Sequence, residues 1–113
     1  MKAVLREKHR YLAFGLISEK KYGLGNDKEQ VRSLERAVNA ELLHILGEIG
    51  LSKVMPRLIL FDGKAGILRT TTKGIADLRT AVALVTSLEG SPAHLRSMLV
   101  SGTIAALKRK LKL

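Results

Sequence analysis

The amino-acid sequence predicts an α/β fold of the α+β class: a split βαβ sandwich with elements in the order βαββαβ, followed by an extra basic helix at the C-terminus. Two observations predict it. Short apolar segments flanked by turn residues are typical of strands, and two longer segments with apolar residues every three or four positions are typical of helices. At 113 residues the chain has the size of one domain, so we expect residues 1–113 to fold as a single unit.

The first strand and the first helix are expected in the N-terminal half. Residues 10–18 (RYLAFGLIS) are apolar and contain aromatic side chains, and turn residues follow at positions 23–27. From Lys28 onward, apolar residues recur at helical spacing, which predicts an amphipathic helix that ends near Gly47 to Gly50. Its apolar positions are Val31, Leu34, Val38, Leu42, Ile45 and Ile49.

A hairpin and a second helix are expected next. Residues 57–61 and 66–71 are predicted strands, joined by a turn at Asp62 and Gly63. Gly90 and Pro92 are expected to end the helix that follows. The apolar positions of this helix are Ile75, Leu78, Val82, Val85 and Leu88.

The last strand is expected from His94 to Val100. It completes the order strand, helix, strand, strand, helix, strand, which is that of ferredoxin-like or RRM-like domains. In such a sandwich both helices cover one face of the sheet, so the other face should read as polar if it is bare.

The strands of this chain are instead apolar on both faces. Successive positions of the first strand and of the first hairpin strand all carry apolar side chains. The second face therefore needs a cover, either the C-terminal helix folding back or another polypeptide. The residues expected at this face are Phe14, Leu58 and Leu60 of the strands and Ile104, Leu107 and Leu111 of the C-terminal helix.

Positive charge is concentrated at the two ends of the chain. The net charge is +10, of which residues 1–10 carry +3 and residues 102–113 carry +4. Ser101 or Thr103 can cap the terminal helix, whose dipole accounts for one or two of its cations. The remaining positive charge favours a nucleic-acid partner, and an acidic membrane surface is the weaker option. The alternative is that the charge only keeps the protein in solution. The candidate binding residues are Arg6, Lys8, Arg10, Lys108, Arg109, Lys110 and Lys112.

The sequence gives little support to catalysis. His9, His44 and His94 are far apart and lack metal-ligand spacing, and Asp62 next to Gly63 is ordinary turn chemistry. Complete glycine-rich nucleotide motifs are missing as well, so we expect no cofactor bound by the chain.

Recognition of nucleic acid by stacking on the sheet is not indicated either. An RNA-recognition motif places aromatic residues on its central strands, whereas the third strand here has Ile67, Leu68 and Arg69. We therefore expect Lys and Arg to contact phosphates, with Arg69 and Arg96 on adjoining strands extending the basic surface.

The chain has no cysteine, which excludes disulfides, thiolate metal sites and cysteine nucleophiles. Its apolar runs are too short to span a bilayer, and its first residues do not have the pattern of a secretory signal. We expect a cytoplasmic protein without a membrane partner.

Three motifs resemble the RNase P protein component 2 family, the small basic protein subunit of archaeal ribonuclease P with a eukaryotic counterpart in RNase P and MRP. They are RYLAF with ISE (residues 10–14 and 17–19), PRLILFD followed by GILR (residues 56–62 and 66–69), and VSGTIxxLKRK (residues 100–110). The last motif is the most specific, and the resemblance spans nearly the whole chain.

The resemblance implies a subunit of the ribonucleoprotein that removes the 5′ leader from precursor tRNA. Its RNA subunit would hold the Mg²⁺ ions and perform the hydrolysis, so this chain would have no catalytic residue. It would bind the catalytic RNA together with RNase P component 3, a TIM-barrel-like subunit, with a heterotetramer as one arrangement. The alternatives are a ferredoxin-like protein-protein interaction module with incidental basic charge and, as a third class, a stand-alone nuclease.

Overall fold

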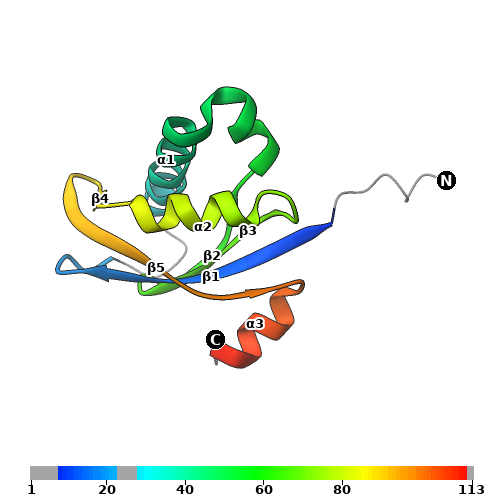
Figure 1. Ribbon diagram of the computed structural model, residues 1–113. Helices are drawn as coiled ribbons and strands as arrows, with labels where there is room; N and C mark the ends of the chain where they lie inside the picture. Colours follow the sequence, from blue (N-terminus) through cyan, green and yellow to red (C-terminus); the bar gives the residue numbers. More distant parts are fainter. Residues whose placement is uncertain (1–7, 23–27, 112–113) are drawn as a thin grey trace.

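The computed structural model describes residues 8–22 and 28–111. In chain order its elements are β1 (His9–Ser18), α1 (Lys28–Val54), β2 (Arg57–Phe61), β3 (Ala65–Thr71), α2 (Ile75–Leu84), β4 (Ser87–Leu88), β5 (Ser91–Ser101) and α3 (Ile104–Leu111). Within these residues, α1 and α2 lie over one face of an antiparallel sheet and α3 lies against the other face (Figure 1).

The strand order in the sheet is β2-β3-β1-β5-β4. Without the short β4, this is the order of a split βαβ sandwich, in which β1 and β3 occupy the centre. The predicted α+β class, with its βαββαβ order and an extra C-terminal helix, is therefore confirmed.

A short hairpin replaces the end of the predicted second helix. α2 ends at Leu84, because Val85 is extended (φ −68°, ψ 123°) and Leu88 pairs with β5. Both residues of the connecting turn, Glu89 (φ 52°) and Gly90 (φ 78°), adopt positive φ, which is the geometry of a type I′ hairpin turn. Leu88 thus reaches the core from a strand, although its spacing fits a helix equally well.

α1 continues past the glycines that were expected to end it. Gly47 departs from helical geometry (φ 74°, ψ −179°), which glycine does easily, and the chain then resumes a helix as far as Val54. Leu51 and Val54 pack on the core, and the hydroxyls of Thr70 and Thr71 in β3 donate to backbone carbonyls at the end of α1. Neither α1 nor any other helix of the described residues is both long and apolar enough to cross a membrane.

The main core lies between the sheet and the helices α1 and α2. Phe14 of β1 and Phe61 of β2 stack there, with ring centroids 6.2 Å apart. The Phe14 ring needs a glycine at position 66 of β3. An ideal Cβ at Gly66 would lie 2.7 Å from Phe14 Cζ and 2.5 Å from the Leu60 carbonyl oxygen.

A β-bulge in β2 decides which apolar side chains face α3. Leu58 pairs with Leu68 and Leu60 pairs with Ile67, so one extra residue of β2 lies between the two pairs. Leu58 therefore packs in the main core, whereas Leu60 packs in the smaller cluster beneath α3. Phe14 also lies in the main core, so the expectation that Phe14 and Leu58 line the second face is corrected.

Gly66→Ala is expected to lower the free energy of unfolding by about 1–3 kcal/mol, because the added methyl group overlaps the Phe14 ring and the backbone of β2. Urea denaturation measures the change. Gly15→Ala is the matched control, since an ideal Cβ at Gly15 lies 3.5 Å from the Met98 sulfur, an ordinary contact. Equal stability of the two variants would contradict the packing described for Phe14.

Candidate nucleic-acid interface

Hydroxyl groups at the end of β5 position the start of α3. Thr103 Oγ1 accepts the backbone N–H of Ala106 at 3.2 Å, and Ser101 Oγ accepts the backbone N–H of Thr103 at 3.2 Å. Thr103 is therefore the N-cap of α3, and the two bonds fix the turn through which the chain leaves the sheet.

Leu107 anchors α3 to the second face of the sheet. Its side chain is fully buried against Ala13 of β1 and Ile67 of β3. Ile104 and Leu111, which lie one turn to either side, pack against the same cluster. Burial of one leucine side chain contributes about 1.5–3 kcal/mol. Because a helix of eight residues is not stable alone in water, this packing is what holds α3 in place.

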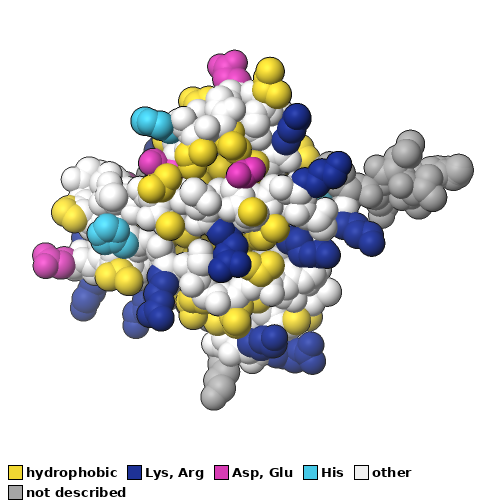
Figure 2. All heavy atoms as spheres, in the orientation of Figure 1, with side chains coloured by type: hydrophobic (Ala, Val, Ile, Leu, Met, Phe, Trp, Pro, Cys, Tyr) yellow, Lys and Arg dark blue, Asp and Glu magenta, His cyan; other side chains and the backbone are white. Residues whose placement is uncertain are grey.

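The outer side of α3 carries three exposed cations, Lys108, Arg109 and Lys110. None of the three makes an ion pair within the part of the chain that the structure describes. Figure 2 shows Lys and Arg side chains grouped over α3, at the bottom of the view. A docked helix with free cations presents a fixed positive surface to an anionic partner.

The pairing of β1 with β5 brings Arg10 next to the turn before α3. Lys8 is exposed just before β1, and Arg10 is half-buried in β1. An ideal Cβ at Gly102, in the turn before α3, would lie 3.7 Å from Arg10 Nη1. The other two candidates, Arg6 and Lys112, lie outside the described residues.

Arg69 and Arg96 do not lie on neighbouring strands, which corrects the expectation that their strands adjoin. β1 separates β3 from β5, with Arg69 opposite Tyr11 and Arg96 opposite Gly15. The direct neighbour of Arg69 in β2 is Arg57. Sequence reasoning missed Arg57, because only the pairing register of the strands shows which residue faces it.

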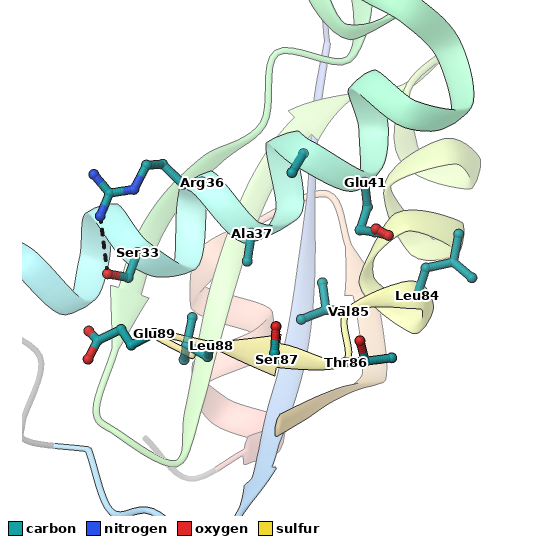
Figure 3. Close-up of a pocket in the computed structure, with 11 residues that line it drawn as sticks. Ser33, Arg36, Ala37, Glu41, Leu84, Val85, Thr86, Ser87, Leu88 and Glu89 are labelled. Carbon is teal, nitrogen blue, oxygen red and sulfur yellow. Dashed lines mark hydrogen bonds between the residues drawn. The ribbon is translucent and has the colours of Figure 1, made fainter. Parts of the chain in front are cut away.

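The hollow between α1 and β4 is a poor site for a polyanion (Figure 3). Its volume is about 390 Å³, and the charged side chains that line it are Arg36, Glu41 and Glu89. Arg36 Nη2 donates to Ser33 Oγ at 3.3 Å. The two carboxylates in the lining would repel phosphates, so the hollow does not suit a polyanionic ligand.

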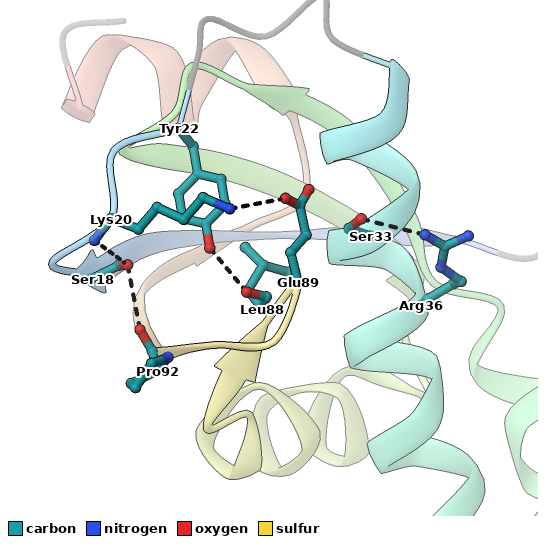
Figure 4. A network of polar contacts seen from close by, with 8 residues as sticks. All are labelled: Ser18, Lys20, Tyr22, Ser33, Arg36, Leu88, Glu89 and Pro92. Atoms are coloured by element: carbon teal, nitrogen blue, oxygen red, sulfur yellow. Dashed lines mark hydrogen bonds and ion pairs between the residues drawn. The ribbon is translucent and has the colours of Figure 1, made fainter.

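Lys20, just beyond the end of β1, is held by a local acid. Its Nζ lies 3.4 Å from Glu89 Oε2 and 5.3 Å from the centre of the Tyr22 ring (Figure 4). The Tyr22 hydroxyl donates to the Leu88 carbonyl at 3.0 Å, which fixes the ring. This cation is therefore partly neutralised, in contrast to those on α3.

The three histidines, all within the described part of the chain, do not lie together at one site. His9 in β1, His44 in α1 and His94 in β5 are all exposed and lie on different elements. Among the residues that the structure describes, no three His, Asp or Glu side chains are close enough to hold a metal ion. Asp62 Oδ1 accepts two backbone N–H groups of the β2–β3 turn, at 2.8 Å each, which is a structural role.

Comparisons with known proteins agree with this description. Residues 10–112 match the sequence pattern of the Rpp14/Pop5 family. Ribonuclease P protein component 2 of Thermococcus gammatolerans is 44% identical over 108 residues, which cover 94% of this chain and 84% of that protein. The protein of the same name from Archaeoglobus fulgidus is 36% identical over 106 residues, covering 94% and 90%. A chain in the cryo-EM structure of yeast ribonuclease MRP has the same fold, with a TM-score of 0.63, 14% identity and coverage of 95% and 91%.

Leu107→Ala is expected to lower the free energy of unfolding by about 2–4 kcal/mol, because it leaves a cavity between α3 and the sheet. Amide hydrogen exchange in α3 should accelerate in parallel, since the helix loses its anchor. Ala105→Ser, at an exposed position of the same helix, is the control. Unchanged exchange in α3 of the Leu107 variant would show that the contact does not hold the helix.

Proposed function

The chain belongs to the Rpp14/Pop5 family, and on this premise we propose that it is a protein subunit of ribonuclease P, the ribonucleoprotein that removes the 5′ leader from precursor tRNA. Its task is to bind and stabilise the catalytic RNA. The observation that carries the proposal is the docked helix α3, whose three exposed cations have no acidic partner among the described residues.

The proposed mechanism is charge neutralisation at the surface of the folded RNA. Phosphates of neighbouring RNA helices repel one another, and fixed cations between them reduce this repulsion. Less Mg²⁺ is then needed to reach the active RNA fold. The residues that would contact phosphates are Arg6, Lys8, Arg10, Lys108, Arg109, Lys110 and Lys112.

In this assembly the RNA subunit would hold the Mg²⁺ ions of the hydrolysis. The scattered histidines and the turn role of Asp62 support a chain that contributes no catalytic residue. The protein would act on the reaction through the fold of the RNA and through the position of the precursor tRNA.

We further propose that RNase P component 3, the TIM-barrel-like subunit, is the protein partner of this chain, with a heterotetramer as one arrangement. The assembly would act in the cytoplasm. Large apolar side chains on the outer side of α1 and after it support such a partner. Leu43, Ile49 and Met55 are 44%, 75% and 53% exposed. Apolar surface of this kind is typical of protein-protein contacts.

Reconstitution tests the proposed function. We expect the chain, added to ribonuclease P RNA from the organism that encodes it, to lower the Mg²⁺ concentration at which precursor tRNA is cleaved. The chain without RNA should cleave nothing. An unchanged Mg²⁺ requirement, together with elution from heparin at low salt, would instead favour an interaction module with incidental charge.

A triple substitution of Lys108, Arg109 and Lys110 by glutamine should weaken RNA binding and reduce its salt dependence. The slope of log affinity against log salt should become shallower by about 2, since each lost phosphate contact removes about 0.7 on the single-strand scale. Lys28, Arg36 and Arg79, which are exposed on α1 and α2, are the control for the same loss of charge. Equal slopes for the two triple variants would rule out a specific role of α3.

A further inference from the structure

Two arginines face each other directly on the sheet. Arg57 of β2 pairs with Arg69 of β3, and Arg69 pairs on its other side with Tyr11 of β1. Tyr11 packs against the cluster beneath α3, and paired residues of neighbouring strands point to the same face. Arg57, Arg69 and Tyr11 therefore form a lateral row on the face that carries α3.

No acid in the part of the chain that the structure describes compensates this pair of like charges. Within the described ranges, neither guanidinium makes an ion pair or a side-chain hydrogen bond. The carboxylate of Glu35 in α1 is used elsewhere, since its Oε2 accepts the backbone N–H of Leu58 at 2.9 Å. Like charges directly opposite each other destabilise a sheet, so the pair costs stability in the free protein.

We propose that Arg57 and Arg69 form a second phosphate-binding site for RNA, separate from the cations of α3. This inference rests on the proposed function and specifies where the RNA crosses the sheet. A guanidinium offers planar, paired N–H donors that match the oxygens of a phosphate. Cβ atoms of directly paired residues lie about 4.5–5.5 Å apart, so both side chains can reach the same stretch of backbone.

Three observations favour RNA over an acidic protein segment as the occupant. The half-buried ring of Tyr11 lies next to Arg69, and an aromatic ring beside arginine suits a nucleic-acid strand. The row shares its face with the free cations of α3. It also lies at the end of the sheet where β1 begins, just after the exposed Lys8. Together these groups extend the positive surface from α3 across to β2.

A charge reversal separates a binding role from a structural one. R57E would place a carboxylate opposite Arg69, so the melting temperature should stay the same or rise. Affinity for RNA should nevertheless fall by about tenfold or more, because one phosphate contact is lost and a repulsion is gained. A variant that loses both stability and affinity would indicate a structural role and overturn the proposal.

The double variant R57Q/R69Q and its control R36Q/R79Q complete the experiment. Both remove two positive charges, but the control residues are exposed on α1 and α2, on the other face of the sheet. With a mixed-sequence single-stranded RNA, the salt slope of R57Q/R69Q should be shallower than that of the control by about 1.4. Equal slopes and affinities for the two double variants would overturn the inference.

The same measurements distinguish this inference from the proposed function. If the unmodified chain lowers the Mg²⁺ requirement of ribonuclease P RNA and R57Q/R69Q does so equally well, only the second site fails. If the chain leaves that requirement unchanged but R57Q/R69Q binds mixed-sequence RNA more weakly than the control, only the proposed function fails. If R57Q/R69Q loses an acidic protein partner and retains RNA, the site belongs to protein and the inference is wrong.

Discussion

The contact of Leu107 with Ala13 and Ile67 is the interaction on which the surface of this protein depends. It closes the apolar centre of the second sheet face, which would otherwise be open to water. It also gives a short helix the tertiary support that its length does not provide. Since the same helix carries Lys108, Arg109 and Lys110, burial on one side fixes the position of positive charge on the other.

The antiparallel topology then brings cations from different strands next to one another. At one end of the sheet, the start of β1 lies between the end of β5 and the Arg57–Arg69 pair, so cations of β2 and β3 lie near the exposed Lys8 that precedes β1. At the other end, Glu89 holds Lys20 beside the β4–β5 hairpin. Among the described residues, the cations of α3 and the Arg57–Arg69 pair therefore make no ion pair, whereas Lys20 does.

Most of the architecture could be predicted because apolar periodicity reports strands and helices directly. The prediction failed where one pattern fits two structures. Leu88 continues the spacing of α2 but belongs to β4, since a two-residue turn at Glu89 and Gly90 reverses the chain. Leu58 and Leu60 alternate as if they shared a face, but a bulge separates them. Neither a turn of this kind nor a bulge changes the periodicity enough to be read from one sequence.

The sequence by itself determined the βαββαβ order, the two apolar faces of the strands and the placement of excess charge at both ends, because these follow from residue type and spacing. Only the tertiary structure decided that α3 covers the second face, that Phe14 and Leu58 belong to the main core, and that Arg57 faces Arg69. The physical reason is that strand register joins residues distant in sequence. A shift of one position moves a side chain to the opposite face, and no local pattern encodes which neighbour it will meet.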